Sequence, residues 1–232
     1  IQELANPFNA EVVSGVSDYL EGNGYFVSVL DARNDIERQK RNIEAFIRSA
    51  RGGLIWVPAH NTPSKTVEIL RNYRIPTITF LRQIKGADFD HVGIKNLEGT
   101  EIATDYLIGL GHTKIAYFGG DTNSDVRKAR VQGYELSLKK NGISWRVIWS
   151  SDDTKRSGVE RFHDLLSEHP EVTALVCNGD MVALGACLAL QSKGLQPGKD
   201  ISVVGFDNVM DAKIVTPSLT TMAVNPYSLG QI

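Results

Sequence analysis

Polar side chains that can form fixed hydrogen bonds follow most of the hydrophobic segments in this sequence. The segment "ISVVGFDN" ends in Asp207 and Asn208, and "ALVCNGD" ends in Asn178 and Asp180. The same placement recurs for Phe8, Asn9, His60, Asn61, Asn96, Glu98, Asp121, Arg127, Arg130, Asp152 and Asp153. Carboxylates and amides suit a ligand rich in hydroxyl groups, and arginine can hold a carboxylate or phosphate with two hydrogen bonds. These residue types therefore predict a binding site for a small polar molecule.

Many of these residues also have a purely structural interpretation. Asn and Asp often cap the helix that follows a strand or shape the turn before it. Taken one at a time, capping or turn formation is the simpler interpretation for Asn9, Asn61, Asn96, Asp153, Asp180 and Asn208. Asp207 differs because it follows three apolar residues and a Gly-Phe pair, so we expect it to be shielded from solvent.

We expect different roles for the two arginines of "DVRKARVQGY", Arg127 and Arg130. Arg127 is explained equally well as a ligand contact and as a solvated helix residue. Arg130 stands near the expected start of a helix, where a cation is unfavourable next to the helix dipole. A carboxylate or ligand partner is therefore favoured for Arg130.

Catalytic motifs are missing from the sequence. It lacks the G-x-S-x-G nucleophile elbow and the G-x-x-x-x-G-K-[ST] phosphate loop, and its five histidines are scattered without metal-ligand spacing. Glu98 with Asp152 and Asp153 could form an acid/base pair, but the sequence does not fix their separation. We therefore expect a binding module and not an enzyme, with no cofactor and no metal.

Short β-branched segments alternate with amphipathic helical segments along the chain. The strand candidates are residues 25–31, 52–59, 76–81, 91–95, 114–120, 146–151, 174–180, 201–207 and 219–225. They are apolar almost throughout, as is typical of strands covered on both faces of a parallel sheet. Helical stripes lie at residues 12–20, 43–47, 102–110, 136–138, 162–166 and 182–190. This alternation predicts an α/β fold of doubly wound parallel sheets, either one large sheet or two similar lobes.

Composition narrows the class of protein further. The 232 residues include 42% hydrophobic and 22% charged residues, which is ordinary for a soluble globular protein. The net charge of −2 gives no general attraction to DNA or to an anionic membrane. Apolar runs are too short to span a bilayer, and no signal peptide is visible. Cys177 and Cys187 are expected to be free thiols in a reducing compartment, and the start at Ile1 suggests a fragment of a longer protein.

Several segments together resemble a known family. They are "LANPFNAEVVSGVSDYLEGNGY", "GLGHTKIAYFGG", the R-x-x-G-Y of Arg130–Tyr134, "ALVCNGDMVALGACLALQSKGL", "DISVVGFDN" and "TPSLTTMAVNPYSLGQ". In this order they are similar to the effector-binding core of lactose-repressor-type (LacI/GalR) transcription regulators, along essentially the whole chain. The "GFDN…TPSLTT" pair is the most specific part of the match.

The resemblance implies a fold and a set of partners. The fold would be periplasmic-binding-protein-like (type I), with one lobe at 1–111 plus 223–232, the other at 112–222, and an effector in the interlobe cleft. The expected function is that of a cytoplasmic regulator, as a repressor, whose effector allosterically controls operator binding. The core would form a homodimer, without a membrane partner. Operator DNA would be bound through a helix-turn-helix domain that is not present in this chain.

The resemblance also assigns the site, position by position. It places seven residues in the effector pocket: Phe8, Asn9, Glu98, Arg130, Asp153, Asn178 and Asp207. Carboxylates and amides would recognise hydroxyl groups of a sugar-like effector, and Arg130 would orient it. Lys95 stands where many members have Asp, and Asp153 where some sugar-responsive members have a stacking aromatic, which leaves the effector open. The alternative is a periplasmic sugar-binding protein of a transport system, which shares the fold.

Overall fold

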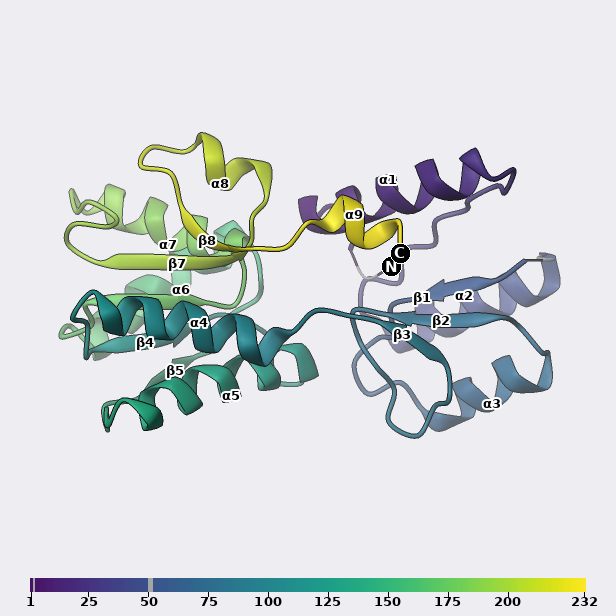
Figure 1. Cartoon of the computed structure of the whole chain (residues 1–232), viewed down its shortest axis with the longest axis horizontal. Coiled ribbons are helices and arrows are strands. Elements are labelled where there is room, and N and C mark those ends of the chain that lie inside the picture. Colours follow the sequence, from purple (N-terminus) through teal and green to yellow (C-terminus); the bar gives the residue numbers. More distant parts are fainter. Residues whose placement is uncertain (2, 50–51) are drawn as a thin grey trace. The chain divides into compact units, whose positions relative to one another are not determined.

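The chain divides into two units in the computed structural model, which describes residues 1, 3–49 and 52–232 (Figure 1). Unit 1 comprises residues 1–94 and 225–232, and unit 2 comprises residues 95–224. The expected boundary after residue 111 therefore differs from the observed one, because helix α4 (Asn96–Gly109) packs in unit 2. Ala103 and Leu107 of this helix are buried in the same cluster as Ile115, Tyr117 and Tyr134.

Unit 1 is built around a small parallel sheet. Its strands β1 (Leu54–Trp56), β2 (Thr77–Phe80) and β3 (Asp90–Val92) pair in the order β1-β2-β3. Its helices are α1 (Pro7–Gly22), α2 (Ile36–Ser49), α3 (Ser64–Asn72) and α9 (Pro226–Gly230). Ile43, Trp56 and Leu70 form a buried core, and α1 lies against α9 (Figure 1). The predicted strands at 52–59, 76–81 and 91–95 are confirmed in shorter form.

The predicted strand at residues 25–31 is wrong. The segment has no regular structure, and Tyr25 and Phe26 are 66% and 91% exposed. Its composition is typical of a strand, but a strand forms only where a neighbour satisfies its backbone groups. Here Ile1 bonds to the carbonyl of Leu30 and to the amide of Ala32, and none of the named strands of the described residues pairs with the segment.

Unit 2 contains a doubly wound parallel sheet of five strands. They are β4 (Ile115–Phe118), β5 (Val147–Trp149), β6 (Ala174–Cys177), β7 (Ser202–Asp207) and β8 (Thr220–Ala223), in the order β5-β4-β6-β7-β8. The helices besides α4 are α5 (Asp125–Lys140), α6 (Lys155–Glu168), α7 (Asp180–Ser192) and the short α8 (Met210–Ile214). Every residue of β4 and of β6 is buried, which explains why these segments are apolar without alternation.

Chain order reverses between β4 and β6. From β4 the chain moves outward to β5, and then returns to add β6, β7 and β8 on the other side. At such a switch point the loops after the two central strands diverge, which leaves space for a ligand beyond their carboxyl ends. None of the helices in the described part of the chain combines the length and apolar character needed to cross a membrane.

Close contact between α4 and α5 depends on Gly133. A Cβ atom at this position would lie 2.2 Å from the Leu97 carbonyl oxygen and 3.0 Å from the Glu101 amide nitrogen, both backbone atoms that cannot move aside. Gly133→Ala is therefore expected to lower the free energy of unfolding by about 1–3 kcal/mol in urea titrations. Gly109→Ala is the control, because a Cβ there meets nothing within 4 Å. Equal losses in both variants would contradict this account of the helix contact.

Candidate ligand-binding site

The carboxyl ends of β4 and β6 meet at the switch point of unit 2. Two glycines follow β4, and Asn178 follows β6, with its amide nitrogen bonded to the Phe118 carbonyl at 2.8 Å. Gly119 and Gly120 have positive φ angles of 105° and 80°. A Cβ on Gly120 would lie 2.7 Å from Arg127 Cδ and 2.7 Å from the Asn178 side chain. Only glycine therefore lets this loop lie against both polar side chains.

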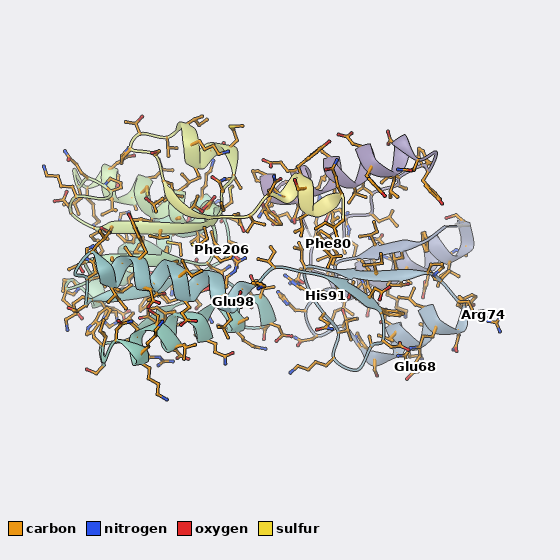
Figure 2. The ribbon with its side chains drawn as sticks, viewed as in Figure 1. Glu68, Arg74, Phe80, His91, Glu98 and Phe206 are labelled. Atoms are coloured by element: carbon orange, nitrogen blue, oxygen red, sulfur yellow. The ribbon has the colours of Figure 1, made fainter. Side chains whose placement is uncertain are left out.

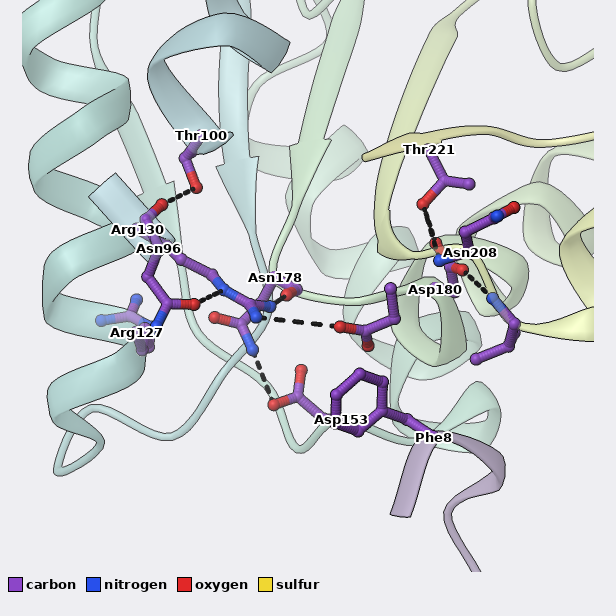
Figure 3. Close-up of polar contacts among 12 residues, drawn as sticks. Phe8, Asn96, Thr100, Arg127, Arg130, Asp153, Asn178, Asp180, Asn208 and Thr221 are labelled. Atoms are coloured by element: carbon purple, nitrogen blue, oxygen red, sulfur yellow. Dashed lines mark hydrogen bonds and ion pairs between the residues drawn. The ribbon is translucent and has the colours of Figure 1, made fainter. Parts of the chain in front are cut away.

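Arg130 joins three segments at this edge of the sheet (Figure 3). Its Nε donates to Asn96 Oδ1 at 2.8 Å, and its Nη1 donates to the Asn178 carbonyl. Its Nη2 lies 3.8 Å from Asp207 Oδ1, and its guanidinium lies 3.8 Å from the centre of the Phe206 ring. The residue is 5% exposed and lies within α5, not at its start as expected, and the expected carboxylate partner is Asp207. We call Arg130, Asp153, Asn178 and Asp207 the polar cluster.

Asp207 is held at the end of β7 in an unusual backbone conformation. Its φ is 117° and that of Asn208 is 60°, both in the region that favours glycine. Strain of this kind persists where surrounding contacts fix the chain, and it is common at binding sites. Burial raises the pKa of the Asp207 carboxyl to about 8, with Arg130 opposing the shift and Asp180 and Asp153 adding to it. The carboxyl therefore changes its charge near neutral pH.

Asn178 connects the remaining members of the cluster. Its Oδ1 accepts from the Tyr117 hydroxyl at 2.6 Å, and its Nδ2 donates to Asp153 Oδ2 at 2.7 Å. Loss of solvation raises the pKa of the Asp153 carboxyl. The hydrogen bond from Asn178 and the charges of Arg130 and Arg127 lower it in part. Asp153 still keeps exposed surface, so a ligand can reach it. Its predicted alternative role as a helix cap is wrong, because Thr154 caps α6.

Asp180 is buried and has a structural role that differs from the expected cap. Helix α7 begins at Asp180 with Gly179 at the N-cap position, and no side chain caps it. The Asp180 carboxylate instead accepts from the Val209 amide at 2.8 Å and from the Thr221 hydroxyl at 2.5 Å. It thereby ties the start of α7 to the loop after β7 and to β8, and the loss of water raises the pKa of this carboxyl.

Sequence reasoning missed or misjudged three neighbours of the cluster. Arg127 is 7% exposed and donates from Nε to the Gly119 carbonyl at 2.9 Å, so the solvated alternative is wrong. Asn96 does not cap α4 but accepts from Arg130. Phe206, labelled in Figure 2, stacks on the same guanidinium. The "GF" before Asp207 was the one signal for Phe206. Asn96 was named as a polar strand-end residue, but its contact with Arg130, which is far away in the sequence, left no signal.

One predicted site residue of unit 2 lies outside the polar cluster, and two others belong to unit 1. Glu98, labelled in Figure 2, lies in the first turn of α4 with a side chain 59% exposed, and it pairs with Lys95 at 3.2 Å. Phe8 and Asn9 belong to α1 of unit 1. Phe8 is 6% exposed, and the Asn9 side chain donates to the Glu3 carbonyl at 2.8 Å. Their assignment to a ligand stays a prediction.

Unit 1 has polar groups of its own at the ends of its strands. Asn34 Oδ1 accepts from Arg82 Nη1 and from the His60 amide, each at 2.9 Å. Three residues here, Asn34, Asn61 and Leu81, have φ angles of 54–60°. Sequence analysis identified His60 and Asn61 as strand-end residues but did not single out Arg82. Asn34 lies in the segment expected to follow the strand that does not form.

The polar cluster can donate and accept hydrogen bonds within a small space. Asp207 and Asp153 offer carboxyl oxygens. Asn178 holds Asp153 by a hydrogen bond, and Arg130 lies beside Asp207 and bonds to the Asn178 carbonyl. Within residues 1, 3–49 and 52–232, no three His, Cys, Asp or Glu side chains are grouped in a way that could hold a metal ion. Such an arrangement at a switch point is typical of an α/β ligand-binding domain and suits a small polar molecule.

Comparisons with known proteins agree with this class. Residues 1–232 match the family described as periplasmic binding proteins and sugar binding domain of LacI family. The chain is 32% identical over 229 residues to the HTH-type transcriptional repressor PurR of Pectobacterium carotovorum subsp. carotovorum (strain PC1), covering 97% of this chain and 67% of that protein. It therefore belongs to the LacI family of periplasmic-binding-protein-like domains. These relatives are named as transcriptional repressors and not as enzymes.

Solved structures of related regulators share the fold. The complex of the transcriptional regulator CelR with cellobiose has a TM-score of 0.88 and 26% identity, covering 98% of this chain and 70% of that chain. A putative ribose operon repressor from Burkholderia thailandensis has a TM-score of 0.87 and 26% identity, covering 100% of this chain and 86% of that chain. The predicted α/β fold with two parallel sheets is thus confirmed, together with the family resemblance.

Proposed function

We propose that this chain is the sensing core of a transcriptional repressor, and that its polar cluster binds a small polar effector. The observation that carries the proposal is the placement of Asp207. A carboxyl with a raised pKa stands on a strained backbone at the end of β7, beside a buried arginine. A turn that serves only the fold has no need of a carboxyl on a strained backbone in a shielded site, whereas a carboxyl held for a ligand is often placed there.

The proposed effector is a sugar or a sugar derivative. Two carboxyl groups of the cluster can each accept from a hydroxyl group, and Asn178 and Arg130 hold them in place. A free phosphate group is disfavoured, because Asp207, Asp153 and the nearby Asp180 would repel it. Related regulators support this choice, since CelR is described in complex with cellobiose and another is named as a putative ribose operon repressor.

Two hydrogen-bond connections give a route from the cluster to the rest of the protein. Arg130 bonds to Asn96, the second residue of unit 2, and Asp180 bonds to Thr221 in β8, close to the end of the unit at Val224. Asn208, the residue after Asp207, donates from its backbone amide to the same Thr221 hydroxyl at 3.4 Å. A ligand that moves Asp207 or Arg130 would therefore act on both segments through which the chain enters and leaves unit 2. In the proposed repressor this coupling changes operator affinity, and operator binding changes effector affinity by the same factor.

A thermal-shift screen tests the proposal directly. Sugars, sugar acids, sugar phosphates and nucleobases would be added to the chain one at a time. An effector present at one hundred times its dissociation constant is expected to stabilise the protein by about 2.7 kcal/mol. The same compound should have no such effect on Asp207→Ala at that concentration. A screen without a stabilising compound, or one whose hits act equally on Asp207→Ala, would contradict the proposed site.

A further inference from the structure

Asp180 is buried more completely than any other charged side chain of the described residues. It is the first residue of α7 and is 0% exposed. Burying a carboxylate is costly unless hydrogen bonds and favourable charges replace the lost water. Here the N-terminal end of α7 favours a negative charge, and donors from two other segments approach the oxygens. A carboxylate kept in such a place indicates a role that depends on its two acceptor oxygens.

Both oxygens of Asp180 hold the chain that follows Asp207 (Figure 3). Oδ2 accepts from the Val209 amide at 2.8 Å, and Oδ1 accepts from the Thr221 hydroxyl at 2.5 Å. The same hydroxyl accepts from the amide of Asn208, the residue next to Asp207, at 3.4 Å. Because asparagine has one acceptor oxygen in its side chain where aspartate has two, only a carboxylate can be the acceptor in both bonds.

The start of α7 also borders the chain before Asp207 and the Asp207 side chain itself. A Cβ atom on Gly205 would lie 2.2 Å from Asp180 Oδ1, so β7 passes directly beside this carboxylate. A Cβ atom on Gly179 would lie 3.3 Å from Asp207 Oδ2. The first residues of α7 therefore contact the chain on both sides of Asp207, which accounts for the persistence of its φ angle of 117°.

Asp180 also acts on the charge of the Asp207 carboxyl. The charged groups around this carboxyl are Arg130 from α5, Asp180 from α7 and Asp153 from the loop before α6. The Arg130 charge lowers the pKa of Asp207, whereas burial and the charges of the two other aspartates raise it. Asp180 thus influences both where the Asp207 carboxyl lies and how readily it ionises.

We propose that Asp180 is the positioning residue of the ligand site, and that it holds the Asp207 carboxyl in place through Val209 and Thr221. The inference rests on the proposed function, and it adds the buried group that sets the central carboxyl of the site. Asp180 acts through Asp207 and not on the ligand, since it is 0% exposed and its oxygens accept from the protein. Loss of the Thr221 hydroxyl should therefore change the behaviour of Asp207.

A titration of Asp207 in the protein without ligand tests this inference. Nuclear magnetic resonance of protein with isotope-labelled aspartate measures the pKa, and the Asp207 signal is the one that Asp207→Asn lacks. In Thr221→Val the pKa of Asp207 should fall from about 8 to about 7 or below, because the released turn lets water reach the carboxyl. Thr221→Ser keeps the hydroxyl and should leave the pKa unchanged. Asp180→Asn should lower it, because the repelling charge is lost.

Thr104→Val is the matched control for the loss of a buried hydroxyl. Thr104 is 0% exposed and donates to the Thr100 carbonyl at 2.7 Å within α4. This variant should lose stability, as Thr221→Val does, and should leave the pKa of Asp207 unchanged. Calorimetric titrations with ribose, glucose and cellobiose then compare affinities. For a sugar that binds, Thr221→Val should weaken binding about tenfold, and Thr221→Ser and Thr104→Val less than about twofold.

The outcomes separate this inference from the proposed function. If folded Thr221→Val matches Thr104→Val in the pKa of Asp207 and in sugar affinity, the positioning role is wrong while effector binding stands. A pKa that falls without a loss of affinity, or an unchanged pKa in Asp180→Asn, would also contradict the role. If none of the three sugars binds to the unaltered chain, the proposed sugar effector itself fails. Unfolding curves of each variant verify that it is folded.

Discussion

Replacement of Arg130 by alanine is expected to lower both effector affinity and stability. The guanidinium satisfies Asn96 and the Asn178 carbonyl, stacks on Phe206 and lies 3.8 Å from Asp207. Removing it takes a donor from the buried Asn178 carbonyl and from the part-buried Asn96 side chain, which is expected to reduce the free energy of unfolding by about 2–3 kcal/mol. Effector binding should weaken by about 1.5–3 kcal/mol, because Asp207 and Asn178 lose the group that positions them. Urea unfolding and calorimetric titration measure the two effects.

Two further variants show whether position or charge matters at this site. Arg130→Lys keeps the charge but cannot bond to Asn96, Asn178 and Asp207 at once, so it should recover only part of both losses. Arg156→Ala removes an exposed arginine that pairs with Glu160 on the helix surface, and it should change stability by less than ~1 kcal/mol. An Arg130→Ala protein with unchanged stability and unchanged affinity would show that the hydrogen bonds of Arg130 support neither the fold nor the ligand site.

The polar cluster also shows what could be predicted from the sequence. Arg130, Asn178 and Asp207 were candidates because they follow predicted strands, and strand ends of a parallel sheet share one edge. The family resemblance then selected them from the longer set of strand-end residues. Asn96 could not be distinguished from a helix cap, since its partner is 34 residues away. Asp180 was misjudged for the same reason, because its partners Val209 and Thr221 come from segments that only the sheet order brings near.

Fold prediction failed where local pattern and tertiary context disagree. Residues 25–31 are rich in β-branched and aromatic residues, yet they form no strand, because pairing requires a neighbour that the local pattern does not specify. The buried strands β4 and β6 were predicted well, because complete burial on both faces requires a continuous apolar run. The family resemblance implied a boundary after α4, whereas Ala103 and Leu107 of this helix pack into the core of unit 2.

Asp207→Asn is expected to weaken effector binding and yet to stabilise the protein near neutral pH. The pKa of Asp207 is about 8 in the folded protein, above the ordinary value of 3.8, so folding favours the protonated carboxyl. Its favourable contribution is complete below pH ~4 and is lost as the pH rises through about 8. Asparagine cannot ionise, so the variant should gain at least ~1 kcal/mol at pH 8, or about 2–4 °C in Tm, and little at pH 4.

Effector affinity should rise with pH as the Asp207 carboxyl ionises. A ligand hydroxyl that donates to Asp207 requires the ionised form, so binding at pH 7 releases a proton and affinity rises between pH 6 and 8. Calorimetry in two buffers of different ionisation enthalpy measures the released proton, and Asp207→Asn should show neither effect. Asp105→Asn is the opposing control, since hydrogen bonds from Ser137 and Lys140 lower the pKa of Asp105. That variant should lose stability at pH 7, and a gain there, or a loss in Asp207→Asn at pH 8, would contradict the assignment of Asp207 as a carboxyl that serves the ligand at the expense of the fold.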